Sequence, residues 1–203
     1  MRRLLLFAVF AVAVAAVGCV TFRVGPEQRA GRVWTLGAGI GPEARGADGG
    51  PSVLVRDIGS ALLYESTQLV AVTDSGMVML SDSDRWAALP AQMLSGILAV
   101  KLASGAGFGT VMRGSGPADL AVDGRLHELG ARQVGGEWYA FLRADVRLVP
   151  ACGGAVLKTM SYSGSSPLES MDYGRLVNAL DALAEEFAEQ AAEELAAGAA
   201  GLR

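Results

Sequence analysis

The chain has 203 residues, of which 51% are hydrophobic, and a formal net charge of −4. That composition excludes a disordered chain, and an acidic protein with only two lysines lacks the basic patch that nucleic-acid binding needs. One histidine and two cysteines cannot form a zinc site of the usual Cys/His kind without several carboxylates. We expect neither a metal nor another cofactor. The length indicates one domain.

The first 18 residues have the pattern of a signal peptide. Arg2 and Arg3 precede fourteen uninterrupted apolar residues, 4–17, and Cys19 follows Gly18. As a helix, fourteen residues rise about 21 Å, which is too short to span a membrane. The segment resembles a bacterial lipobox, in which the cysteine receives acyl chains. An ordinary signal peptide cleaved nearby is the alternative.

The lipobox resemblance implies that Cys19 is the lipidation site. Two or more acyl chains hold a protein stably on a membrane, whereas one chain is marginal. Val20 is not the aspartate that typically retains lipoproteins in the inner membrane, so the resemblance implies the outer membrane, facing the periplasm. We expect a signal peptide over 1–18, a lipidated tether over 19–32, one folded domain over 33–197 and a disordered tail over 198–203.

Cleavage after residue 18 would remove two arginines and no acids, leaving 15 basic and 21 acidic residues and a net charge of −6. With Cys19 acylated, Cys152 has no partner for an intramolecular disulfide. We expect Cys152 to be a small buried thiol; a reactive or metal-binding thiol is the alternative.

The first half of the expected domain predicts strands followed by a helix. Residues 33–36 are typical of an edge strand, and 37–51 hold six glycines and two prolines, which favours a mobile loop. Further strands are predicted at 52–58, 68–73 and 77–80, the last two joined by a turn over 74–76.

Ser83 is a suitable cap for a helix whose apolar residues recur at spacings of three and four. Pro90 lies early in that pattern, so either the helix begins near Leu89 or a kink follows its first turn. The apolar stripe consists of Trp86, Leu89, Met93, Leu94, Ile97, Leu98 and Leu102.

The second half of the domain predicts a meander and a long helix. Strands are expected at 108–112, 120–129, 138–149 and 155–162, with glycine pairs 135–136 and 153–154 at turns. The final helix starts either at Ser166, which has a capping-box pattern, or near Asp172. Its apolar stripe consists of Leu176, Leu180, Leu183, Phe187 and Ala191, and we expect its packing to weaken or end at Glu194. Together these elements predict an α+β, two-layer fold, an antiparallel meander sheet with both helices on one face.

No catalytic constellation is apparent. His127 stands alone, without a serine in a nucleophile-elbow setting or a cluster of metal ligands. We therefore expect neither catalytic residues nor enzymatic activity.

The stretch from Leu62 through Val72 and on to Leu89 carries a family resemblance. It runs through a leucine/tyrosine loop, a hairpin and Arg85-Trp86-Ala87, and Trp34-Thr35-Leu36 precedes it. This pattern is similar to the ABC-type transport auxiliary lipoprotein family, which accompanies mammalian-cell-entry (MCE) type and paraquat-inducible lipid transport systems. The glycine-rich insert at 37–51 and the pair His127-Glu128 depart from the family pattern, which leaves the subfamily and partner transporter open.

The resemblance implies an accessory role without catalysis. The domain would be tethered to the outer membrane and would receive or stabilise the end of an MCE assembly, with ATP hydrolysis on another subunit of the ABC permease and ATPase complex. A ring-shaped homo-oligomer is a further implication, which no periodicity demonstrates. The alternative is an envelope-assembly lipoprotein that handles no lipid.

Three residues of the family-like stretch are candidates for partner binding. Exposed tryptophan and arginine are enriched in binding hot spots, which singles out Arg85 and Trp86. Tyr64, in the loop before the hairpin, is the third. The alternative places Trp86 as the first core residue of its helix, with Arg85 paired locally.

The last helix offers a second candidate surface. Residues 176–202 contain six acids and no base, which equals the whole net charge of the mature chain. Like charges at four-residue spacing destabilise a helix slightly, so local helix stability does not explain Glu185, Glu189 and Glu193. We hypothesise that this face meets a basic surface or keeps the domain off anionic lipid; a merely solvated face is the alternative.

Overall fold

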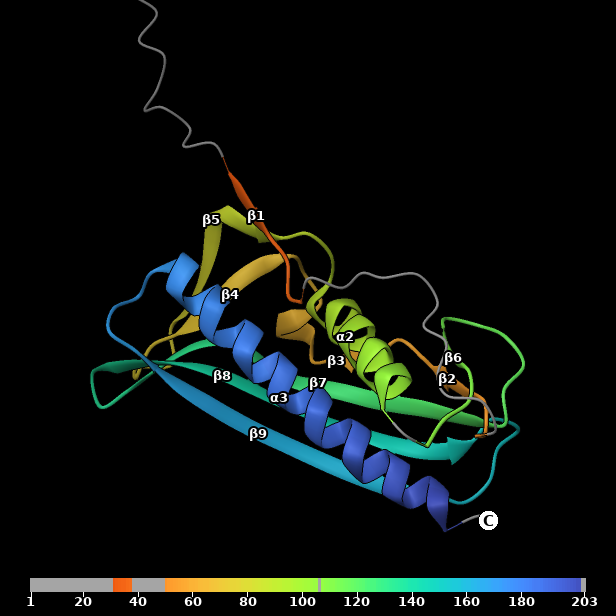
Figure 1. Ribbon diagram of the computed structural model, residues 1–203. Coiled ribbons are helices and arrows are strands. Elements are labelled where there is room, and N and C mark those ends of the chain that lie inside the picture. Colours follow the sequence, from red (N-terminus) through yellow and green to blue (C-terminus); the bar gives the residue numbers. More distant parts are fainter. Residues whose placement is uncertain (1–30, 38–49, 106, 202–203) are drawn as a thin grey trace, which may run out of the picture. The chain divides into compact units, whose positions relative to one another are not determined.

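The computed structural model describes residues 31–37, 50–105 and 107–201. The expected signal peptide, Cys19 and most of both the tether and the 37–51 loop lie outside these residues. In chain order the elements are β1 (Arg32–Trp34), β2 (Val53–Val55), β3 (Gly59–Ser60), the 3₁₀ helix η1 (Leu62–Tyr64), β4 (Gln68–Val72), β5 (Val78–Trp86), α2 (Pro90–Ser104), β6 (Val111–Arg113), β7 (Leu120–Val134), β8 (Glu137–Pro150), β9 (Lys158–Leu168) and α3 (Tyr173–Ala200) (Figure 1).

The strands of the described residues form one nine-stranded mixed sheet. The long strands β7, β8 and β9 are antiparallel neighbours, as expected. However, β7 also pairs in parallel with β2, β3 and β4, and β1 pairs in parallel with β5. The prediction of an α+β fold is confirmed, whereas a purely antiparallel meander is wrong.

The parallel pairs have a topological cause. Between β4 and β7 the chain passes through β5 and helix α2, which is a connection long enough to return it to the same end of the sheet. β7 can then run beside β4 in the same direction. Hydrophobic alternation reports that a strand is buried on one face but not which strand lies beside it, so the sequence did not reveal this pairing.

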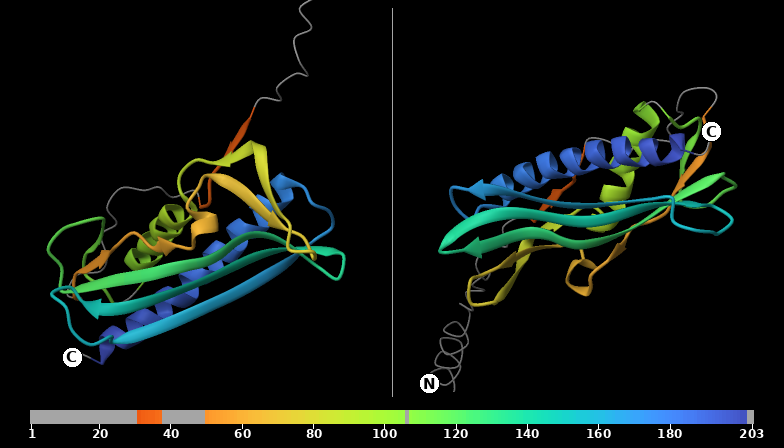
Figure 2. Two further views of the ribbon diagram at one scale, coloured as in Figure 1. Left: turned by 180° about the vertical axis from the view of Figure 1, so that it is seen from behind. Right: turned by 90° about the horizontal axis from the view of Figure 1, so that it is seen from below.

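Both helices lie on one face of the sheet, as expected (Figure 2). Helix α3 packs along β8 and β9, and α2 packs against α3, β2, β6 and β7. Along β8, the buried residues alternate with more exposed ones: Ala140, Leu142, Ala144, Val146 and Leu148 face the helices. The strand therefore has one covered and one open side, which confirms the alternation seen in the sequence.

Helix α2 begins at Pro90, so the expected start at Ser83 is wrong and the alternative start near Leu89 is correct. Residues 84–86 are held in strand conformation because β1 pairs with them. Pro90 suits the first helical position, since its missing N–H is not needed there. Unlike the one-sided stripe that we predicted, α2 is buried around most of its circumference, because it lies against both the sheet and α3.

Helix α3 begins after Asp172, whose carboxylate accepts a hydrogen bond from the backbone N–H of Arg175 at 3.0 Å. The alternative capping box at Ser166 is wrong, because 166–168 are the last residues of β9. Every residue of the expected apolar stripe is buried, which confirms the predicted face of the helix.

The far end of α3 differs from the expectation. The helix continues past Glu194 to Ala200, and Leu195 and Ala199 are buried, so residues 198–200 are helical and no tail begins at 198. Lys158 of β9 places its Nζ 2.5 Å from a carboxylate oxygen of Glu194. This ion pair gives the Glu194 carboxylate a partner of opposite charge. The helix can therefore stay packed against the sheet beyond Glu194.

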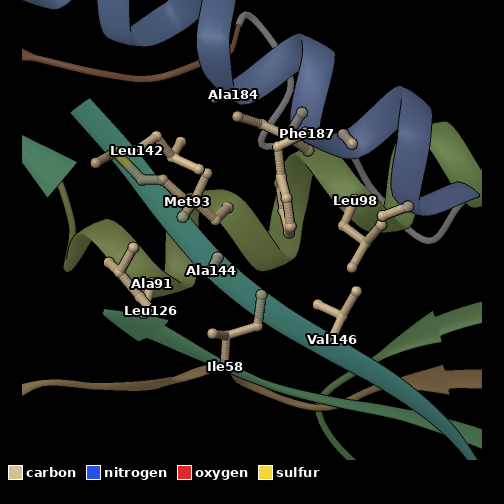
Figure 3. Packing of buried hydrophobic residues seen from close by; sticks show 14 of the residues in the cluster. Ile58, Ala91, Met93, Leu98, Leu126, Leu142, Ala144, Val146, Ala184 and Phe187 are labelled. Atoms are coloured by element: carbon tan, nitrogen blue, oxygen red, sulfur yellow. The ribbon is translucent and has the colours of Figure 1, made fainter. Parts of the chain in front are cut away.

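The core lies between the two helices and the sheet. Figure 3 shows Phe187 of α3 and Leu98 of α2 directed toward the side of β8 that carries Ala144 and Val146. Phe187 is fully buried, and its ring meets that of Tyr162 on β9 edge-on, with centroids 5.8 Å apart. One continuous apolar core therefore joins the two layers.

Candidate partner-binding surfaces

Arg85 and Trp86 end β5, between β1 on one side and β4 on the other. Trp86 is 4% exposed, and its backbone N–H donates to the carbonyl of Thr67 at 2.7 Å. Arg85 is exposed and lies opposite Val33 of β1. Trp86 thus belongs to the core, though in a strand rather than a helix, and of these two residues only Arg85 is exposed.

Asp84, which precedes Arg85, is a structural residue that sequence reasoning missed. It is 2% exposed, and its Oδ1 accepts hydrogen bonds from Arg32 Nε at 2.7 Å and Trp34 Nε1 at 2.8 Å. Burial by itself would raise the pKa of this carboxyl, but the hydrogen bonds from Trp34, Arg32 and Ser83 outweigh it and hold the pKa below its ordinary value. Asp84 therefore fastens β1, the first strand of the domain, to β5.

Tyr64 ends η1 and is 7% exposed. Burial, followed by the nearby charge of Glu128, raises its pKa to about 12, so the phenol stays neutral. The side chain packs in the main core rather than on the surface. Of the three candidates in the family-like stretch, Arg85 is the one that the structure leaves accessible.

The acidic face of α3 is partly paired with the rest of the domain. Lys101 of α2 lies with its Nζ 3.8 Å from Glu185 and 3.4 Å from Glu189. Since Lys158 pairs with Glu194, both lysines of the chain contact this helix. Tertiary contacts therefore offset part of the like-charge repulsion that the sequence alone left unexplained.

Other acids of α3 also have partners. Asp181 accepts a hydrogen bond from the backbone N–H of Gly37 at 2.6 Å, and Glu186 accepts one from the hydroxyl of Tyr162 at 3.0 Å. Glu193 is exposed and makes no hydrogen bond or ion pair with any described residue. The side chains of Glu185 and Glu189 remain 52% and 65% exposed, so these three carboxylates form the outward part of the face.

A shallow cavity of about 300 Å³ lies beside this face, between the end of α2 and the second half of α3. Phe108 and Leu102 provide apolar lining, and Lys101, Glu189 and Glu193 provide the charged lining. The charged lining therefore combines one lysine with two glutamates, and Glu189 is already paired with Lys101.

The remaining candidate groups from the sequence are His127 and Cys152. His127 lies at a bulge in β7, with its Nε2 2.6 Å from Asp145 Oδ2. Among the described residues, no group of three or more His, Cys, Asp or Glu side chains is placed to hold a metal ion. Cys152 is exposed in the turn after β8, so the expectation of a buried thiol is wrong. Cys152 and the residues that follow it, 153–156, are all exposed between the end of β8 and the start of β9.

In the part of the chain that the structure describes, no helix is both long and apolar enough to cross a bilayer.

Comparison with known proteins identifies a family. A family model described as "ABC-type transport auxiliary lipoprotein component" matches residues 34–192, which is most of the described structure. No curated protein matches the sequence.

Two solved structures share the fold. A Xanthomonas campestris protein assigned to the DUF330 family aligns with a TM-score of 0.67 at 13% identity, over 82% of this chain and 96% of that chain. A second, described as an uncharacterized protein, aligns with a TM-score of 0.63 at 15% identity, over 82% of this chain and 99% of that chain. At these identities the likeness concerns the fold alone.

Proposed function

Because the chain belongs to the ABC-type transport auxiliary lipoprotein component family, we propose that it is the outer-membrane-anchored, periplasmic accessory lipoprotein of an MCE-type ABC lipid transport system. In this role it binds or stabilises the transport assembly without catalysing a reaction. The observation that carries the proposal is the family match over 34–192, preceded in the sequence by a lipobox-like segment ending at Cys19. ATP hydrolysis belongs to another subunit.

The proposed anchor is Cys19. Acyl chains on this residue would hold the protein on the membrane, with each buried CH₂ contributing about 0.8 kcal/mol. Twelve residues separate Cys19 from Arg32, the first residue of β1. The signal peptide over 1–18 and the tether over 19–32 are parts of the same proposal.

The anchor is tested by growing cells with radiolabelled fatty acid. We expect label in the wild-type protein and none in Cys19→Ser, with Cys152→Ser, which changes the other thiol, retaining the label. Label that persists in Cys19→Ser would contradict lipidation at this residue.

The proposed partner surface comprises Arg85 and the outward carboxylates Glu185, Glu189 and Glu193. Exposed like charges on one helix face favour contact with a basic surface, which also speeds association. Trp86 and Tyr64 are buried and therefore would not touch the partner directly.

The partner is tested by purifying the protein from membranes and analysing what co-elutes. We expect an MCE-domain protein, a permease and phospholipid in the wild-type eluate. Recovery of another outer-membrane assembly without these components would favour the envelope-assembly role instead.

The acidic face is tested by replacing Glu185, Glu189 and Glu193 with glutamine. We expect less partner in the eluate at low salt, because three negative charges are removed from the proposed contact. A matched control removes three exposed acids elsewhere, Glu65→Gln, Asp82→Asn and Glu169→Gln. Equal recovery from both triple variants would contradict contact through α3.

A further inference from the structure

The start of β5 presents an unusual run of exposed apolar side chains. Met77, Val78, Met79 and Leu80 are 57%, 45%, 37% and 44% exposed. Successive residues of a strand point to opposite faces, so this segment is uncovered on both of its faces. A strand that served only to cover the domain core would bury one of them.

One edge of this segment is also free. β4 pairs with one side, from Val72 opposite Val78 to Val70 opposite Leu80. On the other side β1 pairs with 84–86 only, and no described strand pairs with 78–80. Natural proteins usually protect such an edge with lysine, proline or a bulge. Residues 77–80 contain no lysine or proline, and the bulge of β5 against β4 lies after them, between 80 and 85.

The neighbouring β7–β8 hairpin extends the apolar area. Asp74, in the β4–β5 turn, accepts hydrogen bonds from the backbone N–H groups of Gly135 and Gly136 at 3.2 and 2.8 Å, which ties the two hairpin ends together. Val134, beside those glycines, is 50% exposed. We call Met77, Val78, Met79, Leu80 and Val134 the apolar hairpin end.

Polar groups in the β4–β5 turn are satisfied within the turn. Thr73 Oγ1 accepts from the N–H of Met77 at 3.1 Å and lies 2.8 Å from Ser75 Oγ, and the N–H of Gly76 donates to the Thr73 carbonyl at 2.9 Å. With the Asp74 carboxylate occupied by the two glycine N–H groups, fewer polar atoms of the turn depend on water. Hydrogen-bonded polar groups are much less costly to remove from water than unpaired ones.

The chain itself keeps this region near a membrane if Cys19 is acylated. β1 joins the same strand, β5, that carries the apolar segment, and Leu80 lies four residues from Asp84, opposite Arg32. Four residues of a regular strand span about 13 Å, which is an upper limit here because β5 is bulged against β4 between 80 and 85. The twelve residues between Cys19 and Arg32 reach at most about 45 Å when fully extended. A tethered contact forms at high effective concentration, so even a weak affinity for lipid suffices.

We propose that the apolar hairpin end inserts into the interfacial region of the bilayer that holds the Cys19 acyl anchor. This proposal rests on the proposed function only in requiring that anchor. Lipid surrounds an inserted strand and so covers both apolar faces, whereas a strand added by a protein partner would cover the free edge and leave both faces exposed. Residues 73–84 contain three acids and no base, so the contact is with neutral lipid such as phosphatidylethanolamine and is insensitive to salt.

The test places a fluorophore at matched positions of the full protein, purified with its anchor and reconstituted in phosphatidylethanolamine-rich vesicles. In a Cys152→Ser background, Val78→Cys and Val134→Cys report on the apolar hairpin end. Val156→Cys is the control, since Val156 is 47% exposed and lies in the connection at the opposite end of β8. We expect a vesicle-borne lipid quencher to reduce the fluorescence at 78 and 134 and to leave that at 156 unchanged.

Equal quenching at 78 and 156 would overturn the proposal. The mass of the Cys19 modification is measured on the same preparation. An acylated protein that is not quenched at 78 would refute the hairpin contact and leave the anchor standing. An unacylated protein would refute the anchor, and with it the premise of this proposal.

Discussion

Asp84 shows how one residue can determine the attachment of a whole strand. A carboxylate that is almost fully buried needs partners, and here Arg32 and Trp34, both on β1, supply them. The Arg32 guanidinium also lies 5.1 Å from the centroid of the Trp34 ring, over its face. Since β1 is the first strand of the described part of the chain, this carboxylate fixes the beginning of the domain to β5.

Replacing Asp84 with asparagine should therefore destabilise the domain. The substitution preserves the shape but removes the charge that strengthens these hydrogen bonds, so we expect a loss of about 1.5–3 kcal/mol in the free energy of unfolding. Urea unfolding measures it. Asp82→Asn, at an exposed neighbouring position, should change the value by less than about 0.5 kcal/mol. Equal effects of the two substitutions would contradict the role of Asp84.

The same carboxylate predicts a pH dependence. Because the folded protein holds the pKa of Asp84 below its ordinary value, its contribution is fully present above the unfolded pKa of about 3.9 and is lost as the pH falls through the folded pKa. The stability difference between wild type and Asp84→Asn should stay constant from neutral pH down to about pH 5 and shrink below about pH 4. A difference that instead shrinks on going from neutral pH to pH 5 would assign the effect to another group.

At the scale of single residues, the sequence singled out individual residues but did not show whether their side chains are buried or what they contact. It singled out Arg85 and Trp86, but a helical interpretation of 83–89 concealed Asp84, because spacings of three and four occur by chance in so short a stretch. The exposed thiol of Cys152 was also missed, since composition favours burial of cysteine and only the turn geometry leaves it uncovered.

Helix α3 shows how an element acquires partners that its own sequence lacks. Its carboxylates are spaced so that they repel one another, but Lys101 comes from α2 and Lys158 from β9. The approach of α3 to Lys158 also depends on Gly198, because a Cβ at that position would meet the Cβ of Lys158 at 2.5 Å. The helix can therefore lie close to β9 along its last turns.

The pairing of β4 with β7 depends on a glycine. A Cβ at Gly130 would overlap the carbonyl oxygen of Val70, so Gly130→Ala forces the two strands apart. We expect a loss of about 1–3 kcal/mol in the free energy of unfolding. Gly105→Ala is the control, since the nearest atom to a Cβ there, the Lys101 carbonyl oxygen, is 3.5 Å away. A loss no larger than that of the control, measured by urea unfolding, would show that the strands adjust freely.

At the scale of elements, the strands at 68–73 and 77–80, the β7–β8 turn and the apolar face of α3 were predictable. Strand alternation and helical spacing are local patterns of apolar residues. They predict an element correctly where its apolar side faces the core in the folded protein. The starts of both helices were left as alternatives and were decided by strand pairing: β1 holds 84–86 extended, and β8 holds 166–168 extended.

The domain is one cooperative unit because α2, α3 and the sheet share a core. Phe187 lies at this meeting point and is fully buried (Figure 3). Phe187→Ala should lower the free energy of unfolding by about 3–5 kcal/mol, through lost burial and the cavity left behind. Val100→Ala, at a position that is 41% exposed on α2, should cost less than about 0.5 kcal/mol. Thermal unfolding compares the two; similar midpoints would contradict a shared core at Phe187.

For the whole molecule, the sequence by itself determined the α+β class, the helix that carries the acidic face and, through the family resemblance, the family to which the chain belongs. These follow from local periodicity, composition and motif. Tertiary structure alone decided the parallel pairing around β7, the burial of Trp86 and Tyr64, the partners of the α3 carboxylates and the exposure of the apolar hairpin end. Each of these depends on which distant segments become neighbours, and a pattern along one segment contains no information about its neighbours in space.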